Sequence, residues 1–98
     1  LELDPELADA HNGLGVVAAR RGDMEAAVGH WARAVELDRT QWDALYNLGV
    51  ELTNLNRLEE AIPHLERFAR EAPRTRYAED IPGIRRLARR LREVTGTG

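Results

Sequence analysis

Few side chains in this 98-residue chain could carry out covalent chemistry. The sequence holds no cysteine, serine or lysine, which removes thiol and serine nucleophiles, disulfides, Schiff-base lysines and the lysine of a phosphate-binding loop. Three histidines and scattered carboxylates remain, and acid–base catalysis needs such groups together in one pocket. We therefore predict that the chain is not an enzyme and that it takes no cofactor.

The positions of the histidines do not predict a metal site. The separation of His30 and His64 along the sequence matches the spacing between helix pairs better than a shared coordination sphere. His11 falls on the expected inner face of a helix, where we expect it to be packed. No metal is therefore predicted.

The arginines are concentrated near the C-terminus. Residues 1–73 carry seven arginines against fourteen acidic residues, a net charge of −7, whereas residues 74–98 carry seven against three, a net +4. The candidates for contact with an anionic partner or membrane surface are Arg85, Arg86, Arg89 and Arg90. A solvated last helix is the alternative explanation. No aromatic residue is interleaved for base stacking and the whole chain is acidic, which disfavours nucleic acid.

An internal repeat organises the elements that carry these side chains. Aligning residues 8–41 with residues 42–75 gives nine identical places, where about three are expected between unrelated chains of this composition. Residues 1–7 continue the register as the tail of an earlier copy, and residues 76–95 begin a later one. A period of this length predicts a stacked array of structural units.

Residues that begin and stop helices predict two helices in the first period. Asp4-Pro5 has the character of an N-cap followed by a first helical residue, and the helix is expected to end near Arg21. Asp23 can cap the next helix, which is expected to run to about Asp38. The first period therefore predicts a helix, a short turn and a second helix.

The second period carries the same signals. Thr40, with Asp43 three places on, is typical of a capping box that opens the third helix. Residues 54–57 form the second break, and the fourth helix is expected to run to Ala72, where Pro73 stops it. Pro63 lies early in that helix, where its missing amide costs less.

The last segment, residues 76–95, predicts a fifth helix that runs without a break and caps the array. Its start is open. Either Asp80 is the N-cap, Pro82 lies in the first turn and residues 75–79 form a separate turn, or the helix begins at Thr75 and kinks. Residues 96–98 are expected to fray. Five helices and no strands result.

These features resemble the tetratricopeptide repeat, a helix-turn-helix unit of about 34 residues. The resemblance is carried by Leu14-Gly15 and Leu48-Gly49, by Ala27 and Ala61, by Trp31 and Leu65, by Ala34 and by Pro5 and Pro73. The departures are His11 and Leu45 in place of tryptophan, Ala18 and Leu52 in place of tyrosine, Phe68 in place of alanine and Arg39 in place of proline. The resemblance implies a single all-α domain over residues 1–98: an α-α superhelix of two tetratricopeptide helix-turn-helix repeats, residues 8–41 and 42–75, plus a C-terminal capping helix.

Small residues predict that the paired helices of each repeat approach closely. Gly15 and Gly49 are expected to meet Ala27 and Ala61 with no side chain between them, so that leucine in their place would overpack the pair. Helical geometry of about 100° per residue also defines an inner face for the first helix. The residues predicted to lie there are His11, Leu14, Gly15 and Ala18.

The other side of each first helix is the predicted binding surface. The resemblance implies a protein–protein interaction module that holds a peptide or helix of a partner in a concave groove. Tyr46 and Asn47 are the leading candidates, because tyrosine supplies contact area and an asparagine amide both donates and accepts hydrogen bonds. Packing of the next helix is an equally good explanation for both. The predicted groove residues are Asp9, Asn12, Val16, Asp43, Tyr46, Asn47, Val50 and Asn54.

One subset of the resembled family grips acidic C-terminal tails with lysines, an arginine and asparagines. Only Asn47 matches that pattern, and the other places hold Asn12, Val16, Tyr77 and Ile81. The cationic charge is missing, and an acidic tail would face the carboxylates of Asp9 and Asp43. We therefore predict a neutral or basic protein segment as the partner.

A structural or oligomerisation role within a longer array is the alternative function. The chain begins at Leu1 within the repeat pattern, so we expect it to be a piece of a longer protein, and exposure of Leu1, Leu3 and Leu7 would favour self-association. The sequence shows neither a membrane span nor a signal peptide, so we expect a soluble protein, with the cytoplasm slightly favoured.

Overall fold

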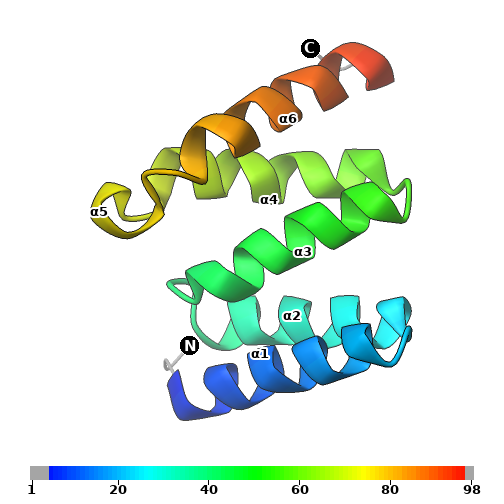
Figure 1. The fold of residues 1–98 in the computed structure, drawn as a ribbon, viewed down its shortest axis with the longest axis vertical. Coiled ribbons are helices and arrows are strands. Elements are labelled where there is room, and N and C mark those ends of the chain that lie inside the picture. The colour runs from blue at the N-terminus through cyan, green and yellow to red at the C-terminus, as the bar shows by residue number, and fades with distance from the viewer. Residues whose placement is uncertain (1–4, 97–98) are drawn as a thin grey trace. The chain divides into compact units, whose positions relative to one another are not determined.

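The computed structural model describes residues 5–96, and these residues form helices joined by short turns, with no strand among them. The helices are α1 (Pro5–Arg20), α2 (Met24–Leu37), α3 (Trp42–Asn54), α4 (Leu58–Glu71), α5 (Arg74–Tyr77) and α6 (Ile81–Thr95). Figure 1 shows the chain running through them in this order. The all-α helical-repeat class predicted from the sequence is therefore confirmed.

The chain divides into two compact units, Leu1–Leu48 and Gly49–Gly98, and the boundary falls inside α3. In the first unit α1 packs against α2, and in the second α4 packs against α6. Each unit has its own buried apolar residues: Trp31 and Leu45 are 4% and 1% exposed in the first, and Leu65 and Phe68 are fully buried in the second.

The repeat is visible in the backbone of the two turns. In the first turn Gly22 has a φ of 82° and the Asp23 amide donates to Ala18 O at 2.9 Å. At the equivalent place of the second turn, Asn56 has a φ of 61° and the Arg57 amide donates to Leu52 O at 2.8 Å. Both turns are Schellman motifs, in which a left-handed residue after the helix satisfies its last carbonyl groups. The breaks predicted around residues 22 and 56 are confirmed.

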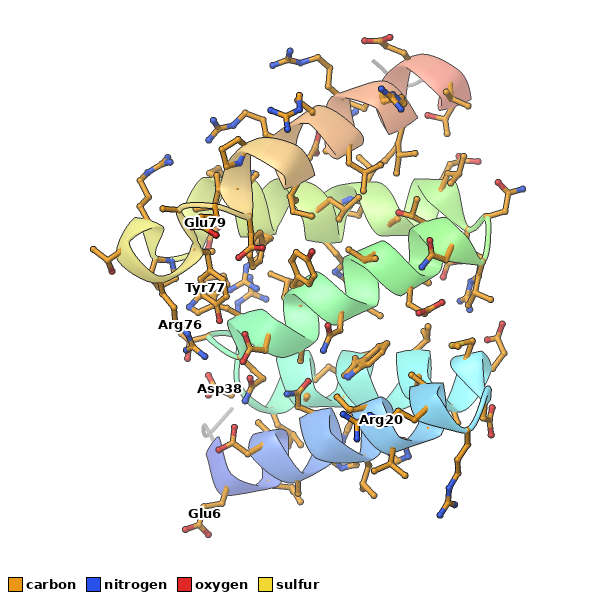
Figure 2. The ribbon with its side chains drawn as sticks, viewed as in Figure 1. Glu6, Arg20, Asp38, Arg76, Tyr77 and Glu79 are labelled. Atoms are coloured by element: carbon orange, nitrogen blue, oxygen red, sulfur yellow. The ribbon has the colours of Figure 1, made fainter. Side chains whose placement is uncertain are left out.

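Asp23 and Asp38 lie at the two ends of α2, as the sequence predicts. Asp23 is the N-cap, and its carboxylate accepts a hydrogen bond from the Ala26 amide at 3.2 Å. Asp38 is the C-cap in extended conformation and is only 9% exposed; it lies at the end of α2 (Figure 2). Its carboxylate accepts bonds from the Thr40 amide at 2.9 Å and the Thr40 hydroxyl at 2.6 Å.

The predicted capping box at Thr40 is wrong. Helix α3 begins at Trp42, so Gln41 is the residue that precedes it, and the Gln41 carbonyl accepts the Leu45 amide at 3.1 Å. The Thr40 hydroxyl instead donates a hydrogen bond to the carboxylate of Asp38, two residues before it in the sequence. The Thr40 amide, which a capping box would direct to Asp43, also donates to the buried Asp38 carboxylate, and this charge-assisted pair holds Thr40 in the turn before the helix.

The group nearest to the place of a Gly15 side chain is the Trp31 ring of α2, where the sequence predicted Ala27. A Cβ atom on Gly15 would lie 2.6 Å from Cδ1 of the Trp31 ring. The indole Nε1 donates to Asn12 O at 3.3 Å, which holds the ring against the backbone of α1. The predicted contact with Ala27 is therefore corrected: the glycine makes room for an aromatic ring, not for a second backbone.

Gly49 has the same role in the second unit, with a smaller neighbour. A Cβ atom there would lie 2.7 Å from Cδ2 of Leu65. The predicted contact with Ala61 is corrected in the same way, since Leu65 lies one helical turn beyond Ala61 along α4. Equivalent places in the two repeats thus accommodate a rigid ring in one unit and a flexible aliphatic chain in the other.

Helix α1 has a buried face and an exposed apolar face. Ala8 and Gly15 are buried toward α2, whereas Leu14, predicted to be core, is 49% exposed. Leu14 is rotated by roughly 100° from Gly15 about the helix axis, which takes it away from α2. It lies instead on the same side as Leu7 and Val17, which are 43% and 45% exposed. Of the other inner-face predictions, His11 and Ala18 are half-buried.

The C-terminal part resolves the alternative left open for the last helix. Helix α5 is a separate single turn, and α6 begins at Ile81 with Asp80 in the N-cap position and Pro82 in its first turn. The Asp80 side chain makes no capping hydrogen bond. The predicted count of five helices is corrected to six in the described residues, because residues 74–77 form a separate helical turn, α5, ahead of α6.

Aromatic and terminal contacts complete the second unit. The Tyr77 ring, in α5, packs edge-on against Phe68 of α4 with a centroid separation of 5.1 Å, and Arg76 lies over the same tyrosine ring (Figure 2). At the other end of α6, Gly96 takes the left-handed C-cap conformation and its amide donates to Arg92 O. Gly96 is therefore ordered as a cap, and the predicted fraying of Thr97 and Gly98 lies outside the described residues. So do Leu1 and Leu3.

Candidate functional site

The predicted binding residues of the first unit lie on adjoining surfaces of α1 and α3, called the α1/α3 face below: Asp9, Asn12, Val16, Asp43, Tyr46 and Asn47. Side-chain hydrogen bonds join α1 to α3 and to the residue that precedes α3. Gln41 Nε2, just before α3, donates to Asp9 Oδ1 at 2.6 Å, and Asn47 Nδ2 donates to Asn12 Oδ1 at 3.5 Å. The structure thus brings Asp9 and Asn12 together with residues 32 to 35 positions away in the sequence.

The residues of the α1/α3 face differ in exposure. Asp9 is exposed, whereas Val16, Asp43, Tyr46 and Asn47 are half-buried. Tyr46 and Asn47 are therefore partly packed within the unit and present their remaining atoms at its surface. The other two predicted residues, Val50 and Asn54, lie farther along α3 in the second unit, where Val50 is half-buried and Asn54 exposed.

The charge carried by the residues of the α1/α3 face is negative. Its ionisable side chains with fixed charge are Asp9 and Asp43, and its remaining polar groups are amides and a phenol. Asp9 is the more exposed of the two carboxylates, and its hydrogen bond comes from the uncharged amide of Gln41. An acidic ligand would meet like charge there.

The structure pairs two histidines that the sequence did not connect. His11 of α1 and His30 of α2 approach with their Nδ1 atoms 3.1 Å apart and their ring centroids 5.4 Å apart. One Nδ1 must carry the hydrogen and the other must accept it, so the two rings hold complementary tautomers. The interhelical contact explains why His11 is packed, and no sequence spacing indicates it, because the partners are on different helices.

His64, at the place in the second repeat equivalent to His30, has different neighbours. Burial lowers the pKa of His64 below its ordinary value, and the nearby Arg67 guanidinium lowers it further, while Glu60 acts in the opposite direction. The same residue type at the same repeat position therefore faces a histidine in one unit and charged side chains in the other. Among the described residues, no group of three or more metal-ligating side chains is found.

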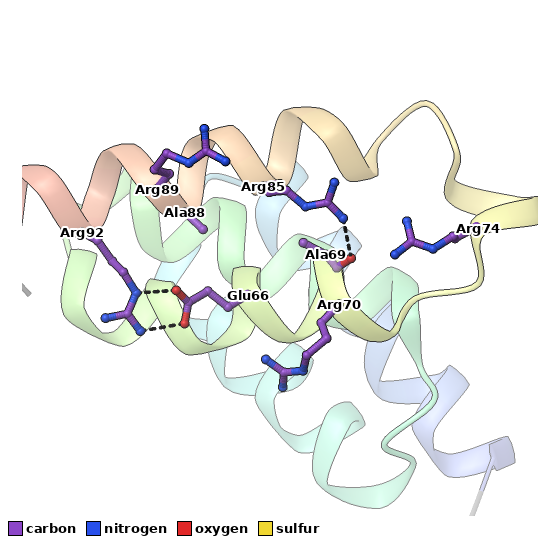
Figure 3. A pocket seen from close by; sticks show the side chains of 8 residues that line it. All are labelled: Glu66, Ala69, Arg70, Arg74, Arg85, Ala88, Arg89 and Arg92. Atoms are coloured by element: carbon purple, nitrogen blue, oxygen red, sulfur yellow. Dashed lines mark hydrogen bonds and ion pairs between the residues drawn. The ribbon is translucent and has the colours of Figure 1, made fainter. Parts of the chain in front are cut away.

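A second candidate site is a cavity of about 560 Å³ in the second unit. Five arginines and a single carboxylate line it, over a floor that includes two buried alanines. The lining side chains, drawn in Figure 3, are Glu66, Ala69 and Arg70 of α4, Arg74 of α5, and Arg85, Ala88, Arg89 and Arg92 of α6.

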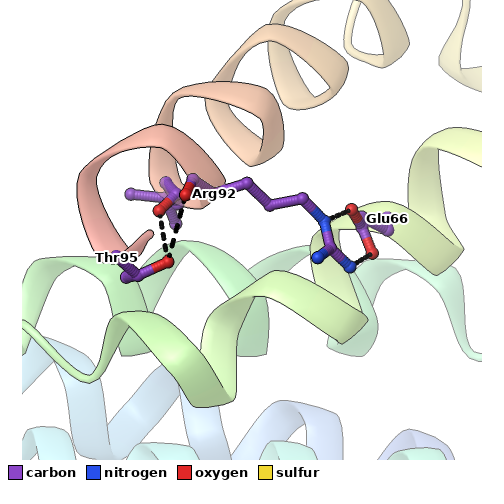
Figure 4. Close-up of polar contacts among 4 residues, drawn as sticks. Glu66, Arg92 and Thr95 are labelled. Atoms are coloured by element: carbon purple, nitrogen blue, oxygen red, sulfur yellow. Dashed lines mark hydrogen bonds and ion pairs between the residues drawn. The ribbon is translucent and has the colours of Figure 1, made fainter. Parts of the chain in front are cut away.

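The single carboxylate of the cavity is already engaged. Arg92 holds Glu66 in a two-pronged contact, with Nη2 donating to Oε1 at 2.7 Å and Nε donating to Oε2 (Figure 4). This hydrogen bonding lowers the pKa of Glu66 and raises that of Arg92. Close to Arg92 along α6, the Thr95 hydroxyl donates to Leu91 O at 2.8 Å, which keeps that hydroxyl on its own helix while the Arg92 side chain extends toward α4.

The predicted arginine contacts divide into two groups. All four are exposed, but Arg85 and Arg89 line the cavity and Arg86 and Arg90 do not. A spacing of four residues puts Arg85 and Arg89 on the same helix face, and Arg86 and Arg90 are rotated from it by about 100°.

Two further arginines of the cavity come from other helices. Arg70 on α4 and Arg74 on α5 were not among the predicted contacts. The four-residue spacing of Glu66 and Arg70 places both on one face of α4, which is a partial signal in the sequence. Nothing local indicates that this face meets α6.

The comparison with family models agrees with the repeat. The tetratricopeptide repeat family model matches residues 1–41 and 25–74, which together span about three quarters of the chain. The chain belongs to the tetratricopeptide repeat family. Searches of curated proteins and of solved structures gave no significant match. Repeats of this family generally mediate protein–protein interactions and are typically not catalytic. No helix in the described part of the chain is long and apolar enough to span a membrane.

Proposed function

We propose that the protein is an interaction module whose α1/α3 face binds an extended, neutral or basic segment of a partner protein. The observation that supports this most directly is the Asn47–Asn12 contact. At 3.5 Å it is at the outer limit of a hydrogen bond and contributes little stability. Exchanging it for hydrogen bonds to a peptide backbone therefore costs little, and each amide can both donate and accept.

The charge of the face supports the same class of partner. The carboxylates of Asp9 and Asp43 attract lysine or arginine side chains and repel an acidic tail. Tyr46 adds a ring with a polar tip, a residue type that is enriched among those that contribute most to protein interfaces. The proposed ligand is thus a segment with basic or uncharged side chains and an accessible backbone.

Selection from a random peptide display library against the whole chain tests this proposal. Selected peptides are expected to be neutral or basic, and Asn47→Ala and Tyr46→Ala are each expected to weaken their binding about tenfold, measured by fluorescence polarisation. Glu36→Ala is the matched control, since Glu36 is an exposed residue of α2 outside the face. Circular dichroism establishes that every variant is folded.

Either of two results would contradict the proposal. Selected peptides that bind Asn47→Ala and Tyr46→Ala as tightly as the wild type do not use this face. Selected peptides that are predominantly acidic do not fit its charge.

Self-association is a second candidate function, favoured by the exposed stripe of Leu7, Leu14 and Val17 on α1. Apolar residues gathered on one side of a helix mark a surface that associates, and a second copy of the chain is the partner proposed here. Sedimentation velocity over a range of concentrations should show a dimer for the wild type and a monomer for Leu14→Gln with Val17→Thr. Val94→Thr is the control, because Val94 is an exposed valine of α6. A monomer at every wild-type concentration eliminates this function.

A further inference from the structure

We propose that the arginine-lined cavity of the second unit binds the phosphate of a phosphorylated side chain in a partner protein. The argument begins with charge. Five guanidinium groups and one carboxylate line the cavity, and that carboxylate, Glu66, is held by Arg92. Arg70 donates to Glu71, its neighbour on α4, at 3.0 Å. Within residues 5–96, no carboxylate pairs with Arg74, Arg85 or Arg89.

The three remaining guanidinium groups come from two helices and share one cavity. Arg74 and Arg85 extend toward each other from α5 and α6, while Arg70 and Arg89 extend outward from the rim (Figure 3). The Arg85 contact with Ala69 O is 3.5 Å long, at the limit of a hydrogen bond, so this group can turn to a ligand at little cost. Like charges that line one cavity repel each other, and an anion bound between Arg74 and Arg85 would lower that repulsion.

The number of available cations matches a phosphate monoester better than a carboxylate. A phosphate monoester carries a charge of about −1.5 to −2 at neutral pH and three strong acceptor oxygens, and guanidinium groups bind it with paired hydrogen bonds. A single carboxylate has two oxygens and one charge, which one arginine satisfies. Arg74 and Arg85 face each other, and Arg89 lines the cavity on the same face of α6 as Arg85, so the guanidinium groups without a carboxylate partner exceed what one acidic side chain requires.

The size and lining of the cavity favour a phosphate attached to a protein segment. At about 560 Å³ the space is within the range of sites for whole ligands and is larger than a bare ion needs. The buried Ala69 and Ala88 form part of its floor, so apolar as well as charged groups line the space. No aromatic residue lines the cavity, so a nucleic acid would have no ring on which to stack.

Nuclear magnetic resonance titration of the whole chain tests the proposal through the arginine Nε–H signals. The probes are a blocked alanine-phosphoserine-alanine peptide, the same peptide with glutamate, inorganic phosphate and a thymidine oligonucleotide. The phosphoserine peptide is expected to shift the Arg74, Arg85 and Arg89 signals saturably. It is expected to bind about tenfold more tightly than the glutamate peptide and severalfold more tightly than inorganic phosphate.

A pair of double variants on one helix provides the matched control. Arg85→Gln with Arg89→Gln should weaken phosphoserine binding at least about tenfold, and Arg86→Gln with Arg90→Gln, which removes the same charge from the neighbouring face, should change it less than about twofold. Arg74→Gln, in the one-turn helix α5, tests the site again should the first pair fail to fold. Asn47→Ala should leave this binding unchanged, so failure here is separable from failure at the α1/α3 face.

Four outcomes overturn the proposal. One is the absence of saturable shifts with the phosphoserine peptide, and a second is equal weakening by both double variants, which would show a response to net charge alone. A third is inorganic phosphate binding as tightly as the peptide, which would make the site one for a free ion. The last is tighter binding of the oligonucleotide through the same arginines with a steep salt dependence, which would identify a nucleic-acid site.

Discussion

The α1/α3 face of the first unit and the arginine cavity of the second are both polar surfaces, but their groups are satisfied differently. On the α1/α3 face, Asp9 accepts from Gln41 and Asn12 accepts from Asn47, so donors and acceptors pair within the protein. In the cavity, five arginines face one carboxylate that Arg92 already holds. A ligand at the first surface must exchange hydrogen bonds, whereas a ligand at the second supplies charge that is missing.

The same contrast extends to the framework beneath these surfaces. The two units contain equivalent positions one repeat apart, yet the neighbour of Gly15 is the Trp31 ring and that of Gly49 is Leu65. His30 meets His11, while His64 lies near Glu60 and Arg67. The two repeats therefore share equivalent backbone positions, but the side chains around those positions differ. Four predictions test this difference.

The largest expected effect separates the two glycines. Gly15→Ala should lower the free energy of unfolding by about 1–3 kcal/mol, because a Cβ atom would enter the Trp31 ring, which is rigid and held by its bond to Asn12 O. Gly49→Ala should cost less than about 1 kcal/mol, because the Leu65 side chain can turn aside and alanine favours the helix. Urea unfolding measures both.

A double variant makes this comparison stricter. Trp31→Leu gives the first unit the residue type found in the second, and Gly15→Ala should cost less in that background than alone. An equal cost in both backgrounds would show that the ring is not the obstacle.

A smaller effect is expected from the different environments of the equivalent histidines. Since burial lowers the pKa of His64, the unfolded chain binds the proton first as the pH falls below the ordinary value of about 6.5. The free energy of unfolding should therefore decrease as the pH falls from that value to the pKa of His64 in the folded protein. Below that pKa, this group should cause no further loss of stability. His64→Gln should flatten the pH dependence of urea unfolding between about pH 8 and pH 5. An unchanged pH dependence in this variant would show that groups other than His64 cause it.

The pair of Glu66 and Arg92 offers a way to sharpen the contrast in charge. Glu66→Gln removes the carboxylate that Arg92 holds, so phosphoserine binding in the cavity should tighten severalfold while the melting temperature falls slightly. Glu59→Gln is the control, because it makes the same charge change at an exposed residue of α4 that does not line the cavity. Equal tightening by both variants would mean that only net charge matters.

The smallest effect is expected at the two left-handed turn residues. Exchanging the residue types, with Asn56→Gly and Gly22→Asn, should change stability by no more than about 0.5 kcal/mol in either case, with Asn56→Gly the more favourable. Alanine at either place should cost more, since its side chain offers nothing to offset the left-handed conformation. Thermal unfolding of the four single variants checks this ranking.

Much of the helical framework could be predicted from local residue preferences. Asp23 caps α2 because a short carboxylate reaches the free amides of a helix start, and Pro73 ends α4 because it cannot continue the hydrogen-bonding pattern. The repeat period predicted the family, which the family model confirmed. Each of these inferences depends on a few neighbouring residues or on the period itself.

The side-chain neighbours could not be predicted in the same way. Leu14 was expected in the core and is 49% exposed, and Gly15 meets Trp31 where Ala27 was expected. Small errors in the rotation of a helix about its axis change which residues face the partner helix, and a period of about 100° per residue makes that sensitivity large. The proposed role of the α1/α3 face stays a prediction, although its residues were all named from the sequence.

What the sequence determined by itself is the order of the five longer helices and the turns within each repeat, because capping, proline and left-handed positions act over a few residues. Only the tertiary structure brought His11 to His30 and collected Arg70, Arg74, Arg85 and Arg89 around one cavity. Those encounters join residues from different helices, and they depend on how the helices rotate and pack against each other. Local preferences define each helix, but long-range packing decides which side chains share a site.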